Sequence, residues 1–424
     1  MFVSYHLSRK DMFAPSFIIC SVFTLSSLFV VMNGDDWGYS ISGEATLYLL
    51  IAILVTILSI SIGTRIKVNT KVDVETDCEC ISGDISNRWM VVLSAISIAI
   101  VYAYFRHQLA LSVALGNGSG LTGMIYTIRM HVYESDNFQL GLALNIGIAF
   151  LRAVGFVSVF FFMHKLIVIK RIQWRYVLPM LSLILYFILT GGRSGFITLI
   201  CAVMYDSYYC FKQIGKKIRP AKTVLYIVIG LVIFLFLFWQ LGKLTGKNTV
   251  LSLWDTLSIY IGSSILCFDA YMNQTNSYNL IGTNTFKGIY NMLARFGLQV
   301  DTIGNHADKI RWNGYSSNIF TAFYAYYIDY GPLFSLIFVS IAGLLIGVLW
   351  GSFREGKGDF ILAVLYGRFV AYAVAMYSIA ERFFSENLAL NTILEMIFVF
   401  FIIEICVHKQ YLITVDAANT NKDF

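Results

Sequence analysis

The sequence predicts an all-α polytopic membrane protein with about ten transmembrane helices, or eleven to twelve on an alternative count. Of its 424 residues, 58% are hydrophobic and 13% are charged, whereas a soluble chain carries about a quarter charged residues. The apolar residues come in runs of roughly 16–22, the length that crosses a hydrocarbon core of ~30 Å as a helix. These proportions exclude a soluble globular enzyme, a disordered chain and a disulfide-stapled secreted domain.

Ten apolar runs account for the expected spans, and the prolines support their limits. The runs cover, approximately, residues 13–32, 45–62, 89–105, 141–163, 176–190, 195–210, 223–241, 333–351, 360–379 and 391–407. Each of the four prolines falls at or just before the start of a run: Pro15, Pro179, Pro220 and Pro332. A proline costs little there, because the first turn of a helix leaves its N–H groups unpaired anyway.

The basic residues predict the orientation, because short cytoplasmic loops are enriched in Lys and Arg. With a cytoplasmic N-terminus, the short inner segments hold most of the Lys and Arg residues, whereas the outer loop 33–44 holds none. We therefore expect both termini in the cytoplasm. The first span lacks a small-residue cleavage site and is expected to remain as a signal anchor.

Two long outer segments, about 105–140 and 242–332, contrast with the short inner loops. Structureless stretches of that length are uncommon unless they are functional. Residues 251–272 carry Leu253, Trp254 and Leu257 at helical spacing together with polar residues, which predicts a helix that lies on the outer membrane surface or re-enters it. A full crossing is the alternative, and it would place basic C-terminal loops outside.

This organisation divides the chain into three parts. Residues 1–241 form an N-terminal transmembrane bundle, residues 242–332 form a large periplasmic loop, and residues 333–424 form the C-terminal transmembrane helices and a cytoplasmic tail. The seven cysteines do not suggest a disulfide framework. Cys78 and Cys80 lack the further Cys or His ligands of a structural zinc site, so no metal is expected.

The most informative short motif is Thr190-Gly-Gly-Arg-Ser-Gly195, where two predicted spans meet in an outer turn. Its glycines allow a tight turn and close approach of a ligand to the backbone. Arg193 would be a permanent charge suited to phosphate oxygens, and the start of the following helix adds anion affinity. A plain hairpin with an interfacial arginine is the alternative interpretation.

Aromatic residues gather just before the eighth predicted span. The segment 315–332 includes Tyr324 and Tyr327 among six aromatics, with Asn318, Thr321 and Asp329 between them. One interpretation is the aromatic belt of a membrane interface, and the other is a stacking surface for sugar rings. Both remain open at the level of sequence.

Three charged residues fall inside predicted spans: Arg152, Arg368 and Glu395. Charges at membrane depth are costly, so they usually face a partner or a cavity. One interpretation is a buried Arg–Glu pair. The other is a charged cleft that reaches into the membrane from the outer side.

The glycine-rich turn, the large outer loop, and the segment Asn318-Ile-Phe-Thr-Ala-Phe…Asp329-Tyr-Gly-Pro resemble the O-antigen polymerases, the Wzy-type oligosaccharide repeat unit polymerases. The resemblance implies a GT-C-like fold in a bacterial inner membrane, with its active site on the periplasmic side. It implies undecaprenyl-pyrophosphate-linked oligosaccharides as substrates, with a chain-length regulator and a flippase of the same pathway as partners beside the lipid bilayer, and no nucleic acid. An arginine followed after ten residues by glycine, noted in outer loops of some members, is missing here.

Joining two lipid-linked glycans needs cationic groups for the leaving pyrophosphate, a base near the attacking hydroxyl and a polar cleft beside the lipid. The expected catalytic residues are Arg193, Arg295, Arg382, Asp269 and Asp329. The expected substrate-binding residues are Gly192, Ser194, Arg311, Asn318, Thr321, Tyr324 and Tyr327. Further candidate bases are His306, Asp308, Glu381 and Glu386. No paired Asp-x-Asp and no nucleotide-phosphate loop is present in the sequence, so metal-independent transfer from a lipid donor, without a cofactor, is expected.

Three other functions compete with a polymerase. An O-antigen ligase would use the same chemistry with lipid A–core as the acceptor. A flippase or secondary transporter would often show internal repeats and helices broken at mid-membrane, which the sequence does not show. A structural assembly factor of the envelope would not need the arginines.

Overall fold

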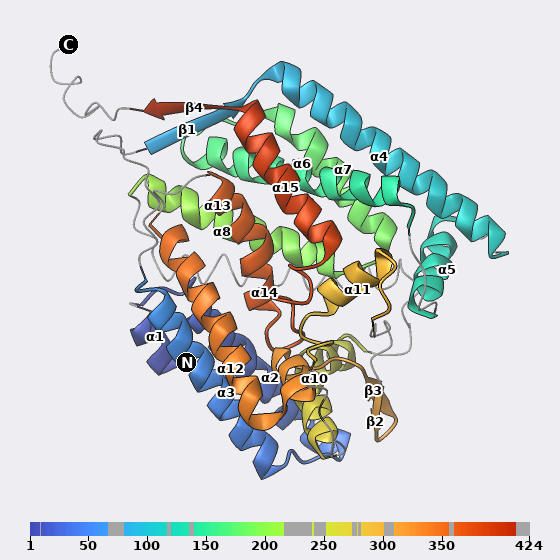
Figure 1. Cartoon of the computed structure of the whole chain (residues 1–424), viewed down its shortest axis with the longest axis vertical. Helices are drawn as coiled ribbons and strands as arrows, with labels where there is room; N and C mark the ends of the chain where they lie inside the picture. The colour runs from blue at the N-terminus through green and yellow to red at the C-terminus, as the bar shows by residue number, and fades with distance from the viewer. Residues whose placement is uncertain are drawn as a thin grey trace.

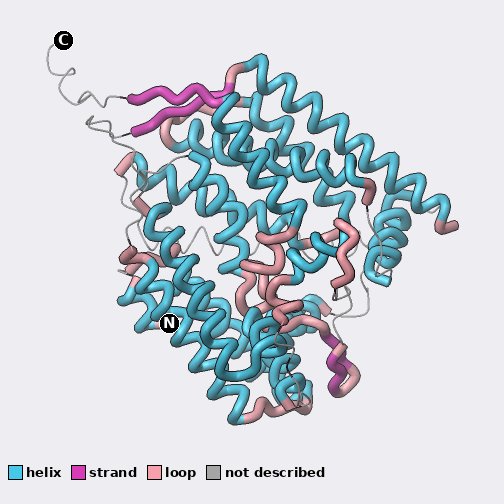
Figure 2. Tube along the Cα trace, in the orientation of Figure 1, coloured by secondary structure: helices cyan, strands magenta, loops and turns pink. Residues whose placement is uncertain are grey.

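The computed structural model describes residues 1–8, 10–66, 80–116, 120–134, 140–215, 240, 252–273, 278, 281–300, 309–355 and 360–412. Most of these residues are helical, and strands are confined to two short two-stranded sheets (Figure 2). The predicted helical fold class is confirmed at this level. The predicted span 223–241 lies outside the described residues, apart from residue 240.

The first part of the chain folds into a helical hairpin. Its helices are α1 (Phe2–Leu7), α2 (Pro15–Trp37) and α3 (Gly43–Gly63). Gly38 ends α2 in the left-handed conformation, with φ 57°, which glycine adopts without steric cost. The side chain of Ser42 caps α3 by accepting a hydrogen bond from the backbone N–H of Ala45 at 3.2 Å, as N-cap serines do.

The middle of the chain builds the core of the bundle. Its elements are β1 (Cys80–Ile85), α4 (Asn87–Ala114), α5 (Gly120–Glu134), α6 (Leu142–Ile167), η1 (Trp174–Tyr176), α7 (Val177–Thr190) and α8 (Ser194–Gln213). Helix α6 packs against α4, α7, α8 and the C-terminal helix α15 (Leu390–Cys406). It is the central helix of this half, and most of its residues from Leu151 to Phe161 are buried.

The last part of the chain completes the bundle. Its elements are α10 (Leu253–Met272), α11 (Lys287–Arg295), β2 (Ile310–Trp312), β3 (Tyr315–Ser317), α12 (Ala322–Phe353), α13 (Phe360–Leu365), the π-helical turn η2 (Tyr366–Val370), α14 (Ala371–Ala375), α15 and β4 (Val407–Leu412). All nine predicted spans within the described residues fall on helices. Segments of α5, α10 and α11 add helices inside the predicted outer loops.

Helices α3 and α12 pack with their backbones close together. A Cβ atom on Gly347 would lie 2.3 Å from the carbonyl oxygen of Ile60, and one on Gly63 would lie 2.3 Å from the carbonyl oxygen of Leu344. Small residues allow this kind of approach between membrane helices. The long α12 is thereby fixed to the N-terminal hairpin.

Helix α12 starts earlier than the predicted span and contains a kink. Gly331 has φ 73° and ψ −178° inside it, and Pro332 follows. Two helical segments therefore meet at this kink, because glycine tolerates the positive φ and proline then starts a new helical turn. The predicted start of the span at residue 333 falls at the start of the second segment.

Helix α10 lies at one end of the α2–α3 hairpin. Near its start, Trp254 Nε1 donates to Asn33 Oδ1 at 3.0 Å, and near its end Asp269 Oδ2 accepts from the hydroxyl of Tyr39 at 2.8 Å. A helix of 20 residues is about 30 Å long, yet both of its ends contact the same end of the hairpin. Whether this helix crosses the membrane stays a prediction.

Several elements of the predicted inner and outer segments lie on different sides of the bundle. The β1–β4 sheet projects at the upper left and α1 lies on the left, whereas α5, α11 and the β2–β3 hairpin lie toward the right (Figure 1). The first group belongs to the predicted inner segments and the second to the predicted outer segments. Which end faces the cytoplasm stays a prediction.

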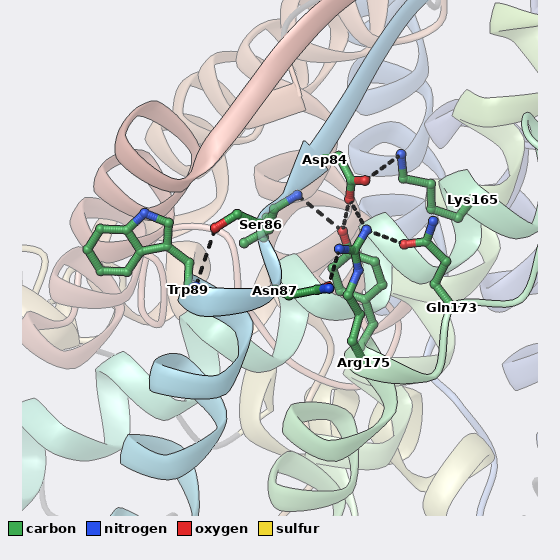
Figure 3. Close-up of polar contacts among 9 residues, drawn as sticks. Asp84, Ser86, Asn87, Trp89, Lys165, Gln173 and Arg175 are labelled. Atoms are coloured by element: carbon green, nitrogen blue, oxygen red, sulfur yellow. Dashed lines mark hydrogen bonds and ion pairs between the residues drawn. The ribbon is translucent and has the colours of Figure 1, made fainter.

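Strands β1 and β4 pair antiparallel, with Ile85 opposite Val407, and Asp84 ties this sheet to the bundle (Figure 3). The Asp84 carboxylate accepts from the guanidinium of Arg175 and, at 2.7 Å, from the hydroxyl of Tyr176, and Lys165 Nζ lies 3.5 Å away. Burial alone raises the pKa of Asp84, but these hydrogen bonds and positive charges outweigh it and hold the pKa below its ordinary value.

Within the described residues, five helices are long and apolar enough to cross a membrane: α2, α3, α4, α6 and α12. The other predicted spans within these residues form shorter or less apolar helices. The chain is thus a helical membrane protein by length and composition of its helices, and the total of about ten crossings and the GT-C-like arrangement stay predictions.

Candidate functional site

A cavity of about 520 Å³ lies among helices from both halves of the chain. Its walls come from α6, α7, α8, α11, η2, α14 and the start of α15, together with the connection between α14 and α15. Both α11 and that connection belong to the predicted outer segments. Cavities of about 300–1,000 Å³ are typical of small-molecule sites.

Glu395 holds two arginines at the floor of this cavity. Its Oε1 accepts from Arg368 Nε at 2.8 Å, its Oε2 accepts from Arg368 Nη2 at 3.3 Å, and Arg152 Nη2 lies 2.9 Å from Oε2. The Glu395 side chain is fully buried, whereas Arg152 and Arg368 line the cavity. The sequence left open a buried Arg–Glu pair or a charged cleft from the outer side. The structure shows the buried contacts, and both arginines also line the cavity, whereas the side from which the cavity opens stays a prediction.

The π-helical turn η2 carries Arg368. Such turns widen a helix locally and occur often at functional sites. The guanidinium carbon of Arg368 lies 4.6 Å from the ring centre of Phe369 and 4.9 Å from that of Phe156. These aromatic faces favour the cation, so the arginine is held between rings and carboxylate.

The opposite side of the cavity carries a more exposed ion pair. Arg382 donates to Glu386, and their side chains are 33% and 38% exposed, against 7% for Arg368. The negative charge of Glu386 outweighs burial and raises the pKa of Arg382. Arg295 and Lys287 of α11 line the same side, and Arg295 is exposed. Exposure thus increases from the floor toward this mouth.

The glycine-rich turn between α7 and α8 forms part of the wall, as the sequence predicts. Gly191 ends α7 with φ 63°, and Gly192 and Ser194 line the cavity. Arg193 lies between them, but its guanidinium carbon packs 5.3 Å from the ring centre of Tyr260 in α10. Burial lowers the pKa of Arg193, and nearby Arg129 lowers it further.

The cavity is strongly positive. Of the described residues, five cationic side chains line it, with Glu386 as a counter-charge in the wall and Glu395 behind the floor. The positive lining residues are Arg152, Lys287, Arg295, Arg368 and Arg382. An anion is the ligand that such a charge distribution favours.

Several buried donors on the lining side chains find no acceptor within the described part of the chain. They are Arg152 Nε, Arg382 Nε and the hydroxyl of Tyr372. Buried polar groups are nearly always hydrogen-bonded in folded proteins. Donors of this kind, on arginines that can bind oxygen anions in a forked geometry, suit a phosphate group.

Asp269, expected as a catalytic residue, does not line the cavity. Its Oδ1 accepts from the hydroxyl of Ser42 at 2.5 Å and from the Ser42 backbone N–H at 3.3 Å, in addition to the bond from Tyr39. Burial, and then the hydrogen bond to Asp269, raises the pKa of Tyr39. The carboxylate therefore fastens α10 to the turn between α2 and α3.

Asp329, the other expected catalytic carboxylate, also lies away from the cavity lining. It accepts hydrogen bonds from the backbone N–H of Thr285 at 2.7 Å and from Asn284 Nδ2 at 2.8 Å. It is fully buried. These bonds fix the segment before α11 to the first part of α12.

Most of the aromatic residues of the segment 315–332 lie in the first turns of α12, where they pack in or against the core, and they do not line the cavity. The Tyr324 ring stacks on Phe320 with ring centres 4.0 Å apart, and the Tyr327 ring contacts Tyr48 at 5.1 Å. Thr321 occupies the N-cap position of α12 without a capping hydrogen bond from its side chain, and it is buried. Asn318 follows β3 and is partly buried, and Arg311 is exposed on β2.

The sequence predicted that Arg295, Arg382 and the glycine-rich turn at 190–195 belong to one site, and all three contribute to the cavity wall. It did not predict several other lining residues. Lys287, Tyr372 and Asn391 also line the cavity. The sequence indicated that Arg152 and Arg368 face a partner or a cavity, since both are charges within predicted spans. His306 and Asp308 lie outside the described residues.

Comparison of the chain with protein-family models, with curated proteins and with solved structures finds no match.

Proposed function

We propose that this chain is a membrane-embedded glycosyltransferase that joins undecaprenyl-pyrophosphate-linked oligosaccharide repeat units into O-antigen or a related surface polysaccharide. The reaction would occur at the periplasmic face of the inner membrane. The observation that carries the proposal is the cationic cavity, lined by four arginines and a lysine, within a bundle of membrane-type helices.

The chemistry of the proposed substrate explains why so many arginines are needed. When a glycosidic bond forms, the bond from the anomeric carbon to the diphosphate breaks and negative charge grows on the leaving diphosphate. Fixed cations at that position stabilise the transition state. Arg382 and Arg295 lie toward the mouth, where a lipid-borne diphosphate would arrive, and Arg152 and Arg368 lie deeper.

A deletion strain tests the proposal when it is complemented with arginine variants. Wild-type protein restores long surface glycan, whereas Arg295→Ala and Arg382→Ala leave mainly single repeat units on lipid A. Removal of one such stabilising donor typically costs about 10²–10³ in rate. Arg106→Ala, an exposed α4 residue bonded to Tyr102, is the matched control and restores long glycan.

A flippase of the same lipid-linked glycans is the second candidate, because charges at membrane depth also mark transport pathways. The deletion strain separates these functions. Single repeat units on lipid A indicate a missing polymerase, while the complete loss of glycan from lipid A indicates a flippase or an O-antigen ligase.

A further inference from the structure

Two carboxylates, Glu395 and Glu386, contact the arginines that line the cavity, and their surroundings differ. Glu395 is fully buried, and both of its oxygens accept bonds from Arg368, with Arg152 as a second cation on Oε2. It is committed to holding those guanidinium groups. A substrate hydroxyl would have to displace an arginine in order to reach it.

Glu386 lies in the cavity wall and is more open. Its side chain is 38% exposed, and its Oε1 accepts from Arg382 Nη1. Within the described residues, no hydrogen bond to its Oε2 is found. One carboxylate oxygen is therefore held in place by Arg382, and the other is available to a ligand in the cavity.

The other acidic candidates near this end of the bundle are engaged in fold contacts. Glu381 is buried and accepts from the backbone N–H groups of Phe384 and Ser385, each at 2.8 Å, and from the hydroxyl of Tyr326 at 3.1 Å. Asp269 and Asp329 are tied to distant segments, as described above. Of the described carboxylates, Glu386 lines the cavity.

We infer that Glu386 accepts the proton of the attacking sugar hydroxyl, with Arg382 as the residue that positions its carboxylate. This inference rests on the proposed function. In the step, the hydroxyl oxygen of the acceptor glycan bonds to the anomeric carbon of the donor. The bond from that carbon to the diphosphate oxygen breaks, the diphosphate leaves with the electron pair, and the hydroxyl proton moves to Glu386.

The placement of charges fits this division of roles. A general base must lie within hydrogen-bond reach of the hydroxyl it deprotonates, and the cations must lie beside the departing diphosphate. Glu386 and the lining arginines share one cavity, so both requirements are met at adjacent positions. Arg382 would contact both the base and the leaving group.

The test uses the purified full-length chain with lipid-linked repeat units extracted from the deletion strain, and measures polymer formation. Glu386→Gln is expected to slow transfer by about 10²–10⁴-fold, and Glu386→Asp is expected to retain part of the rate. Glu355→Gln, at an exposed residue just beyond the C-terminal end of α12, is the matched control with wild-type rate. Gel filtration and thermal unfolding confirm that each variant is folded.

Binding of inorganic pyrophosphate separates the base from a merely structural partner of Arg382. With Glu386→Gln, pyrophosphate affinity should stay equal to wild type or increase, because a negative charge is removed from the cavity. Parallel loss of binding and transfer, or transfer within tenfold of wild type, would overturn the inference. Wild-type protein that forms no polymer would defeat the proposed function itself, and the inference with it.

Discussion

The guanidinium of Arg368 and the carboxylate of Glu395 face each other in a two-point contact, with Nε–Oε1 at 2.8 Å and Nη2–Oε2 at 3.3 Å. This geometry gives more directional strength than a single contact between charges. Arg152 shares the same carboxylate at 2.9 Å. Glu395 therefore offsets one of the two positive charges of Arg152 and Arg368. The floor of the cavity keeps a net positive charge and can still attract an anion.

The first prediction concerns this shared carboxylate. Glu395→Gln leaves Arg152 and Arg368 without their counter-charge, and breaking a buried pair in this way typically costs about 3–5 kcal/mol. We expect a clearly lower Tm for the purified variant in detergent. Glu404→Gln, an exposed position on the same helix, should unfold close to wild type. Equal Tm values for Glu395→Gln and wild type would show that the carboxylate does not stabilise the floor.

The second prediction concerns pH and Asp84. Its pKa in the folded protein lies below the ordinary value, which is about 3.9 in the unfolded chain. The stabilisation from Asp84 is thus fully present above about pH 4 and is lost as the pH falls through the lower, folded-state pKa. In thermal unfolding, the Tm of wild type should exceed that of Asp84→Asn at neutral pH, and the difference in Tm should shrink in acid.

The control for that pH series is Asp35→Asn, an exposed position in α2. Its Tm should follow wild type across the whole range. A gap between wild type and Asp84→Asn that stays constant down to strong acid would contradict the role assigned to the charge of Asp84.

The third prediction separates structural from catalytic carboxylates. Asp269→Ala removes the acceptor of Tyr39 and Ser42, which are partly buried, and leaving a fully buried donor unsatisfied costs about 1–3 kcal/mol as an upper range. We expect a lower Tm but an unchanged transfer rate per folded molecule, because Asp269 does not line the cavity. A rate loss of two orders of magnitude or more in folded Asp269→Ala protein would restore this residue as a catalytic candidate.

The fourth prediction concerns orientation. A periplasm-active reporter fused after residue 300 should be active, because residues 242–332 belong to the predicted outer segments. The same reporter fused after residue 215, where α8 has ended, should be silent. The reverse pattern would invert the topology and place the cavity mouth on the cytoplasmic side.

Much of the fold could be predicted because membrane helices are encoded locally. Runs such as 141–163 need only length and apolarity, and the helix found there is α6, Leu142–Ile167. The pairing of β1 with β4 was not predictable, since it joins residues 80–85 to 407–412. The kink of α12 at Gly331 was visible only as a Gly-Pro dipeptide that the sequence interpretation placed outside the helix.

The site could be predicted only in part, because its geometry depends on long-range contacts. The turn at Gly192 has a local signature, and Arg295 and Arg382 were expected as outer-face cations. Their convergence with Arg152 and Arg368 depends on how α6, α11 and η2 pack. Tyr324 and Tyr327 illustrate the opposite case, since aromatic residues suited to sugar contacts serve here as core side chains.

The most direct test of the central claim measures two products of one reaction. Purified full-length protein in nanodiscs is mixed with lipid-linked repeat units, and glycan length and released undecaprenyl diphosphate are followed together. The account predicts one diphosphate lipid released for each bond formed, with both products falling in parallel when Arg295 and Arg382 are both replaced by alanine. Glycan growth at the wild-type rate in that double variant, or no growth with wild-type protein, would contradict it.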